Sequence, residues 1–480
     1  MAAAPELSRN RRLLILAICC MSLLIMGLDT TVVNVALPSI RRELHASLAG
    51  LQWTIDAYTL VIASLLVLAG STADRVGRRR VFQLGLVVFS LASLLCGLAG
   101  SLELLVAFRV LQAVGGSMLN PVAMSIIRNV FEDPRERAMA IGAWGGVFGL
   151  SMALGPVVGG ALVDAASWRL VFFVNVPIGL AAILLTSLYV PESRADHPRR
   201  LDPIGQLLVI GALASLTYAI IEGPRHGWTS AEILALIGVS ASCFATLVTY
   251  ELRRAEPLLE LRFFRSAPFS GASAIAVLAF ATLGGFLFLN TLYLQDVRGL
   301  SPLDAGLYLL PMAGMLVVFA PLSGRLIGRV GSRPSLVLAA AALIASALML
   351  TRITPTTPTG YLLGSYFLAG IGSGLVNPPI TNTAVSGMPS AQAGVASAIA
   401  STSRQVGMTL GVAVIGAIAA GAIPSKIGPG FAAATHPAWW VIAGFGVAIL
   451  VLGLLTTTRW ADRTATRTAA HISESEMAPA

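Results

Sequence analysis

Residues 141–160 read IGAWGGVFGLSMALGPVVGG and contain seven glycines and one proline within a long apolar run. Inside a helix, glycine costs roughly 1 kcal/mol and proline about 3 kcal/mol relative to alanine. A helix that only crossed lipid would avoid these residues. Small residues let the backbones of neighbouring membrane helices approach closely, and proline permits a bend. The stretch therefore predicts a gate helix in a membrane protein that changes shape.

The rest of the chain has the composition of a membrane protein. Of its 480 residues, 56% are hydrophobic and 11% are charged, whereas soluble domains carry about 25% charged residues. The apolar runs are long enough to cross a bilayer as helices. We therefore predict an all-α polytopic membrane protein. Its fourteen spans are expected at residues 13–38, 50–71, 81–100, 102–130, 138–163, 169–190, 204–222, 231–250, 269–294, 304–328, 335–352, 360–386, 395–421 and 438–458.

The net charge of +9 is explained by topology. If the amino terminus is cytoplasmic, the cytoplasmic segments hold 23 Arg and Lys residues and the outer segments hold 7. Membrane proteins carry this excess of positive charge on the cytoplasmic side. The sequence predicts a multi-pass membrane protein with both termini cytoplasmic and no nucleic-acid partner. Its 31 Arg against one Lys indicate a bacterial genome, so a bacterial plasma membrane is expected. Because all four cysteines lie in apolar spans, neither a disulfide framework nor a metal site is expected.

An internal repeat divides the chain into two halves. GSTADRVGRR at 70–79 resembles GRLIGRVGSR at 324–333, and GGSMLNP at 115–121 resembles GSGLVNPP at 372–379. Internal repeats of this kind are typical of membrane proteins built from two bundles. The distance between the copies leaves room for two inserted helices. We predict a six-helix bundle at 1–198, two inserted helices at 199–258, a second six-helix bundle at 259–460 and a mobile cytoplasmic tail at 461–480. The second bundle begins with a linker that lies either in the membrane interface or in solvent.

Two motifs resemble those of the major facilitator superfamily. The glycine-rich stretch is similar to the superfamily's antiporter motif, with Ser151 where glycine is usual. Its matching positions are Gly142, Gly155, Pro156, Gly159 and Gly160. The segment GSTADRVGRRR is similar to the superfamily's loop motif. Its matching positions are Gly70, Asp74, Arg75, Gly77, Arg78 and Arg79.

The resemblance implies gating roles for both motifs. The antiporter motif accompanies exporters that exchange their substrate for an ion. The loop-motif arginines need anionic partners, and Glu132 and Asp133 are the expected ones. Such ion pairs would hold the two bundles together on the cytoplasmic side. The alternative is that these arginines only follow the positive-inside rule.

Charged side chains inside the spans are candidates for proton coupling. LDTTVVNVALP at 28–38 contains Asp29, WTIDAYTL at 53–60 contains Asp56, and RVLQAVGGS at 109–117 contains Arg109. A charge in the middle of a membrane costs roughly 2.5–3.5 kcal/mol, so Arg109 needs an acidic partner. Asp29 and Asp56 are the available acids, and the pair is either released for protonation or permanent. Glu222, at the end of the seventh span, is either a proton or cation site or an exposed loop carboxylate.

Other polar and aromatic side chains are candidates for lining a substrate cavity between the bundles. These are Trp53, Tyr58, Gln112, Asn290, Gln295 and Arg404. Phe148 and Phe286 are further candidates. For most of these side chains the alternative is contact with lipid or packing in the core.

The resemblance extends over residues 13–458 and is strongest to the fourteen-helix branch of drug–proton antiporters. LDTTVVNVALP and SWRLVFFVNVPIG, at 167–179, carry it. The sequence is similar to actinobacterial members of this branch that export antibiotics. The resemblance implies a monomer that exports small lipophilic compounds by alternating access, driven by a proton gradient without any cofactor. A proton-coupled importer of a small metabolite and a non-transporting sensor or scaffold are the alternatives.

An enzyme is not expected. No nucleophile–base pair and no metal-ligand cluster stand out in the sequence. The phosphate-binding motif G-x-x-x-x-G-K-[ST] is absent, so an ion gradient must supply the energy.

Overall fold

The computed structural model describes residues 8–195, 201–254, 257–385, 393–422, 427–428 and 430–477. Arg199, Arg200 and Lys426, which entered the charge count, lie outside these residues. The helices run in the order α1 (Arg9–Leu44), α2 (Leu48–Val76), α3 (Arg78–Gly97), α4 (Leu102–Val130), α5 (Pro134–Ala165), α6 (Leu170–Phe173), α7 (Asn175–Tyr189), α8 (Pro203–His226), α9 (Ala231–Glu251), η1 (Leu261–Arg265), α10 (Ala267–Leu292), η2 (Tyr293–Val297), α11 (Pro302–Tyr308), α12 (Leu310–Val330), α13 (Ser332–Leu350), α14 (Thr359–Val385), α15 (Ala393–Ala422), α16 (Phe431–Ala434), α17 (His436–Thr456) and α18 (Arg459–Met477).

Fourteen segments of the described chain are long and apolar enough to cross a membrane, which confirms the predicted number. Most are single helices. The sixth, tenth and fourteenth spans are each divided by a short break, so that α6 and α7, α11 and α12, and α16 and α17 form one span per pair. The break between α6 and α7 falls at Val174 and directly precedes Asn175. Pro177 accounts for it, because proline has no N–H to donate to the carbonyl of Phe173 and its ring crowds that carbonyl.

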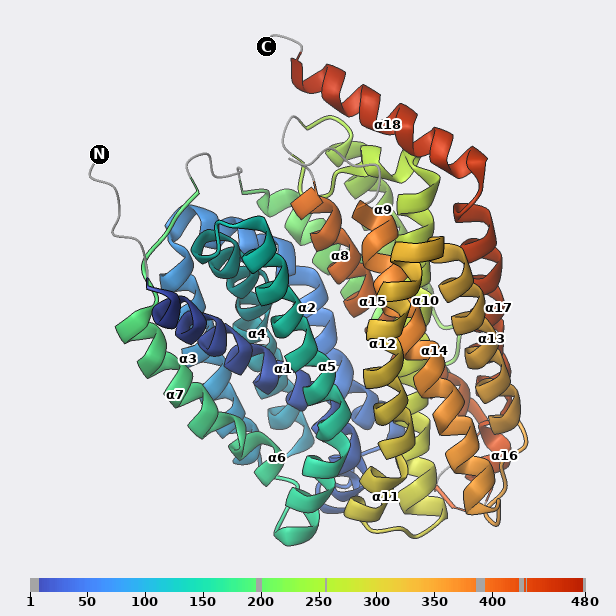
Figure 1. The fold of residues 1–480 in the computed structure, drawn as a ribbon. Coiled ribbons are helices and arrows are strands. Elements are labelled where there is room, and N and C mark those ends of the chain that lie inside the picture. The colour runs from blue at the N-terminus through green and yellow to red at the C-terminus, as the bar shows by residue number, and fades with distance from the viewer. Residues whose placement is uncertain are drawn as a thin grey trace.

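The helices form two bundles that stand side by side, with both chain ends on the same side of the molecule (Figure 1). Helices α1–α7 make the first bundle and α10–α17 the second. The inserted helix α8 contacts both α2 and α15, whereas α9 packs mainly on α8. The insert therefore covers the line along which α2 of the first bundle meets α15 of the second.

Small residues set the closest helix contacts inside each bundle. A Cβ at Gly115 of α4 would lie 2.5 Å from the backbone nitrogen of Phe89 on α3. A Cβ at Gly407 of α15 would overlap the backbone carbonyl of Val277 on α10. Membrane helices gain packing contacts when their backbones approach in this way. The predicted role of small residues in helix packing is therefore seen in both bundles.

The two bundles meet most closely on the side away from the chain ends, which we call the far side; the opposite side is the terminal side. Nε2 of Gln295 donates to the carbonyl of Val35 at 2.8 Å. The backbone nitrogen of Leu303 donates to Oδ2 of Asp164 at 2.9 Å. These contacts join the far-side ends of α1 and α5 to α11 and η2, so this conformation is closed on the far side.

Two segments flank the second bundle. The tail after Trp460, expected to be mobile, forms most of α18, which packs on α10 and η1. Its Ala461, Ala465 and Thr468 are buried and recur at helical spacing. In the linker before α10, Phe263 is fully buried. Its neighbours Arg262, Phe264 and Arg265 are exposed, so the choice between the membrane interface and solvent for this linker stays a prediction.

Candidate functional site

The first bundle contains a buried polar network around one ion pair. Nη1 of Arg109 on α4 lies 2.6 Å from Oδ2 of Asp29 on α1, and both side chains are at most 1% exposed. Gln112 accepts from Nη1 of Arg109 at 2.7 Å and donates to Oδ1 of Asp29 at 2.8 Å. Asn175 on α7 donates to the same Oδ1 at 3.2 Å. The expectation that Arg109 has an acidic partner is confirmed, and the partner is Asp29.

The guanidinium of Arg109 is enclosed on its other sides. Nε donates to the carbonyl of Thr54 on α2 at 3.1 Å. Its Cζ lies 4.1 Å from the ring centroid of Tyr58 and 5.7 Å from that of Phe172. No atom of Asp29 or Arg109 is buried without a hydrogen-bond partner. Since a buried ion pair offsets its desolvation only when its remaining hydrogen bonds are made, this pair has the surroundings that it needs.

Asp56 on α2 is a second buried carboxylate with different surroundings. Its side chain is fully buried, and neither carboxylate oxygen has a hydrogen-bond partner among the described residues. On the same helix, Nε2 of Gln52 donates to the carbonyl of Ala413 on α15 at 2.9 Å. Oγ1 of Thr59 accepts from Oγ1 of Thr409 on α15 at 2.8 Å. Residues at such spacings share one helix face, so Asp56 lies on the face of α2 that meets the second bundle.

Glu222 anchors the insert to the first bundle. It is 7% exposed and lies within α8, so its interpretation as an exposed loop carboxylate is wrong. Oε1 accepts from Nε1 of Trp53 on α2 at 3.1 Å, and Oε2 lies 3.8 Å from Nη1 of Arg225. The ring of Trp53 also lies against that of Tyr218, with 5.8 Å between their centroids. A proton or cation role for Glu222 stays a prediction.

The residues expected to line a substrate cavity do not surround one space in this conformation. Trp53 contacts the insert, whereas Tyr58 and Gln112 belong to the buried network. Gln295 joins the bundles on the far side, as described above. Arg404 lies between α14 and α15, where its Nη2 donates to Oγ1 of Thr381. Their assignment to a cavity therefore stays a prediction.

Asn290, the remaining candidate, belongs to a neutral counterpart of the ion pair. Oη of Tyr366 on α14 donates to Oδ1 of Asn290 on α10 at 2.7 Å, and both side chains are fully buried. Tyr366 lies eleven residues before Asn377, as Arg109 lies eleven residues before Asn120. The repeat thus places a neutral hydrogen bond in the second bundle where the first bundle has an ion pair.

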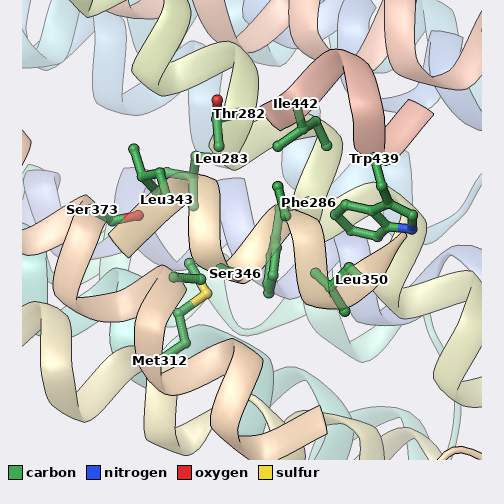
Figure 2. A pocket seen from close by; sticks show the side chains of 12 residues that line it. Thr282, Leu283, Phe286, Met312, Leu343, Ser346, Leu350, Ser373, Trp439 and Ile442 are labelled. Atoms are coloured by element: carbon green, nitrogen blue, oxygen red, sulfur yellow. The ribbon is translucent and has the colours of Figure 1, made fainter. Parts of the chain in front are cut away.

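The second bundle also contains a small internal pocket, which Figure 2 shows from close by. Phe286, Met312, Leu343 and Trp439 line it from four different helices. Its free volume of about 10 Å³ is at the lower limit for one water molecule. Sites for drug-sized ligands span roughly 300–1,000 Å³, so this pocket does not hold such a molecule in the present conformation.

The glycine-rich stretch on α5 divides into two parts with different surroundings. On the far side, a Cβ at Gly155 would overlap Oγ1 of Thr31, and one at Gly160 would overlap the carbonyl of Pro302. A Cβ at Gly159 would lie 3.0 Å from Val32. Toward the terminal side, a Cβ at Gly142 would meet no atom within 4 Å. Close approach is therefore confirmed at the first three positions, and its prediction at Gly142 is wrong for this conformation.

Pro156, between these glycines, also faces the second bundle. Its carbonyl lies where a Cβ at Gly306 of α11 would be. The far-side half of α5 thus contacts α1 and α11 through backbone atoms. Whether these residues gate a conformational change stays a prediction.

The loop motif after α2 is held by partners other than the predicted ones. Arg78 pairs with Asp74, with 2.9 Å between Nη2 and Oδ1. The backbone nitrogen of Arg79 donates to Oε1 of Glu192 at 3.1 Å, and its Nη2 donates to the carbonyl of Ser187 at 2.5 Å. For Arg78 and Arg79, the prediction of Glu132 or Asp133 as partner is therefore wrong.

The reason lies in the end of α7. Oδ1 of Asp133 is already used as the N-cap of α5, where it accepts from the backbone nitrogens of Arg135 and Glu136. Glu192, just after α7, fills the space beside the loop motif instead. Gly77 has φ of 130°, and a Cβ there would lie 2.7 Å from Oε1 of Glu192, which explains the glycine. Gly70 faces Pro121 of α4, at 3.6 Å from its Cβ. Arg75 also takes part in an interaction.

Sequence reasoning missed three members of the buried sites. Asn175 and Ser93 complete the network, since Ser93 accepts from Gln112 at 2.7 Å, and Gln52 ties α2 to α15. Asn175 could have been found, because it is a polar residue within the apolar segment SWRLVFFVNVPIG. The break between α6 and α7 directly precedes it. Ser93 and Gln52 carry no comparable signal.

Comparison with known proteins identifies the relatives of this chain. The family model described as Major Facilitator Superfamily matches residues 19–412. A tetracenomycin C resistance and export protein of Streptomyces glaucescens is 38% identical over 410 residues, covering 85% of this chain and 75% of that protein. The multidrug efflux pump LfrA of Mycolicibacterium smegmatis is 34% identical, covering 84% of this chain and 80% of that protein.

Solved structures share the fold at low sequence identity. A bacterial homolog of the human lysosomal transporter Spinster, in an inward-facing and unoccupied conformation, aligns with a TM-score of 0.63 and 19% identity. The alignment covers 98% of this chain and 100% of that chain. A mutant of the nucleoside transporter NupG aligns with a TM-score of 0.64 and 13% identity, covering 94% of this chain and 100% of that chain.

Proposed function

The chain belongs to the major facilitator superfamily, and from this premise we propose that it exports lipophilic drugs or antibiotics from a bacterial cell in exchange for protons. Relatives at 34–38% identity that are named as drug or antibiotic exporters support the direction and the substrate class. The inserted helix pair, which gives fourteen spans, fits this branch. The energy comes from the proton gradient, and no cofactor takes part.

The observation that carries the proton coupling is the position of Asp56. It is a buried carboxylate without a partner, on the face of α2 that meets the second bundle. A buried carboxylate without a cation is costly, so the present conformation favours Asp56 in its neutral, proton-bound form. When the bundles rock apart along α2 and α15, water from outside reaches this face and the carboxylate takes up a proton. The neutral group is buried again as the far side closes, and its proton then leaves to the cytoplasm in exchange for the drug. The carboxylate thus binds a proton on one side of the membrane and releases it on the other.

The ion pair of Asp29 and Arg109 serves this mechanism as a fixed element of the first bundle. Asp29 has a cation and two amide donors. Protonating it would leave Arg109 charged and buried without a counterion, which costs about 3–5 kcal/mol. We therefore assign the exchangeable proton to Asp56 and a structural role to the pair.

The proposed orientation places the terminal side in the cytoplasm, as the distribution of arginines indicates. The conformation closed on the far side then belongs to the half of the cycle in which a drug would enter from the cytoplasm. One charge that crosses about 100 mV supplies about 2.3 kcal/mol. This is enough for roughly fifty-fold accumulation of substrate outside the cell for each net charge moved.

Transport in inverted membrane vesicles tests the proposal. Vesicles with an acidic lumen should accumulate ethidium against its gradient when they contain the wild-type protein. Asp56→Asn should abolish accumulation yet retain ethidium exchange down its gradient, because the conformational change no longer needs a proton. Asp304→Asn is the matched control, since Asp304 is an exposed far-side carboxylate, and it should behave as wild type.

Three outcomes would contradict the proposal. Undiminished uphill transport by Asp56→Asn would show that Asp56 does not carry the exchanged proton. Accumulation only in vesicles of the opposite orientation would indicate a proton-coupled importer. A folded protein that moves no substrate in either orientation would indicate a sensor or scaffold.

A further inference from the structure

Arg404 is the second arginine inside a span, and its surroundings contrast with those of Arg109. It lies in the half of α15 nearer the terminal side and is partly buried. Its Nη1 donates to Oγ of Ser401 at 3.4 Å and its Nη2 donates to Oγ1 of Thr381 on α14. Its Cζ lies 6.0 Å from the ring centroid of Phe280 on α10. Among the residues that the structure describes, its buried Nε has no hydrogen-bond partner.

No carboxylate in this bundle can compensate the charge of Arg404. The sequence has neither Asp nor Glu between Asp304 and Asp462, so helices α12–α17 carry no acid. Asp296, in η2 directly after α10, is on the far side and pairs with Arg41 at 3.3 Å. Among the described residues, Arg404 has no ion pair.

The contacts that Arg404 does make are weak for a guanidinium. Arginine stays charged in proteins and presents a rigid fork of donors that matches a carboxylate or phosphate. Two hydroxyl oxygens and one distant ring leave much of this capacity unused. Arg109 shows what a permanently enclosed arginine looks like in this chain: a carboxylate at 2.6 Å and, among the described residues, no fully buried nitrogen without a hydrogen-bond partner. The surroundings of Arg404 therefore leave its guanidinium able to bind an anion.

The site can be reached in this conformation. Thr381, the hydroxyl partner on α14, is exposed, and Arg404 is itself partly exposed. Both lie toward the terminal side, away from the closed far side. Phe280 adds an aromatic surface beside the charge.

We propose that Arg404 forms an anion subsite that binds the carboxylate, phenolate or sulfonate of a lipophilic aromatic substrate. This inference rests on the proposed export function and adds the substrate's charge to it. The guanidinium would bind the anion through its fork, Thr381 would turn its hydroxyl toward the same group, and Phe280 would contact the substrate's ring. The protein would then prefer anionic over cationic members of one chemical scaffold.

Binding of two related dyes to the purified protein tests the proposal. Dichlorofluorescein is an anionic xanthene dye, whereas tetramethylrhodamine methyl ester is a cationic one with an esterified carboxyl group. Fluorescence polarisation in neutral detergent should show that Arg404→Gln weakens binding of the anionic dye about tenfold or more, because a charge-assisted contact is lost. Binding of the cationic dye should change less than about twofold. Arg404→Lys should recover part of the loss, since it keeps the charge without the fork.

Further measurements separate the sources of the anion. Titration with sodium phosphate and with phosphatidylglycerol micelles tests whether an inorganic ion or a lipid headgroup displaces the dye. Displacement by either at a concentration below the dye's own Kd would overturn the assignment to a substrate. Equal loss of both dyes in Arg404→Gln, or no preference of the wild type for the anionic dye, would do the same. Dye binding in detergent measures neither export nor proton coupling, so its result is independent of the result of the vesicle experiment.

Discussion

Asp29→Asn offers the sharpest test of how the first bundle is held together. The substitution removes the negative charge but keeps the side-chain shape, so Arg109 becomes a buried cation without a counterion. Two opposite charges about 4 Å apart interact by about 4 kcal/mol at an effective dielectric constant near 20. Removing one partner of a buried ion pair costs about 3–5 kcal/mol. The two estimates agree, and both side chains are at most 1% exposed, so screening by solvent does not reduce them.

The assay is a double-mutant cycle on the purified protein. Asp29→Asn, Arg109→Gln and the double variant are compared with wild type by reversible unfolding in mixed micelles. Each single variant should lose about 3–5 kcal/mol of unfolding free energy. The double variant should lose less than the sum, because two amides leave no unpaired charge. Ser90→Ala is a suitable control, since the hydroxyl of Ser90 has no partner in the same bundle.

Transport separates structure from coupling in the same variants. Per molecule of folded protein, Asp29→Asn should retain uphill transport if Asp56 carries the proton. Single-variant losses that simply add in the double variant would refute the reasoning, because they would mean that the two charges do not interact. A coupling defect in Asp29→Asn equal to that of Asp56→Asn would refute the assignment of roles.

Two further predictions concern packing in the two halves. Gly160→Val should prevent closure on the far side, because its Cβ would overlap the carbonyl of Pro302. Alkylation of a cysteine placed at Leu303 should then become faster. Gly142→Ala is the control and should leave that rate unchanged, because no atom lies within 4 Å of the new Cβ. Tyr366→Phe should lower the unfolding free energy by about 1–3 kcal/mol, because Oδ1 of Asn290 loses its buried donor. A loss below about 0.5 kcal/mol would show that Asn290 finds another donor. Tyr361→Phe is the control for this variant, because the hydroxyl of Tyr361 donates to a backbone carbonyl in a partly buried position.

The sequence alone determined the membrane class, the number of spans and the division into two halves. Each follows from a local property of the chain. Long apolar runs must become helices in lipid, because no water is present to satisfy the backbone. The repeated Arg-Val-Gly and Asn-Pro segments mark the two halves. They can be recognised from the sequence because each is a run of consecutive residues. The need of Arg109 for an acid was equally predictable, since a lone charge inside a span is too costly.

Only the tertiary structure decided which groups meet. The sequence left Asp29 and Asp56 as equal partners for Arg109, because both lie in neighbouring spans. Helix rotation decided between them: Asp29 faces α4 and α7, whereas Asp56 faces α15. The same holds for the loop motif, where Glu192 replaced Glu132 and Asp133 as the acid beside the arginines. Such choices depend on how helices far apart in the sequence turn toward one another, and no local pattern of residues encodes that rotation.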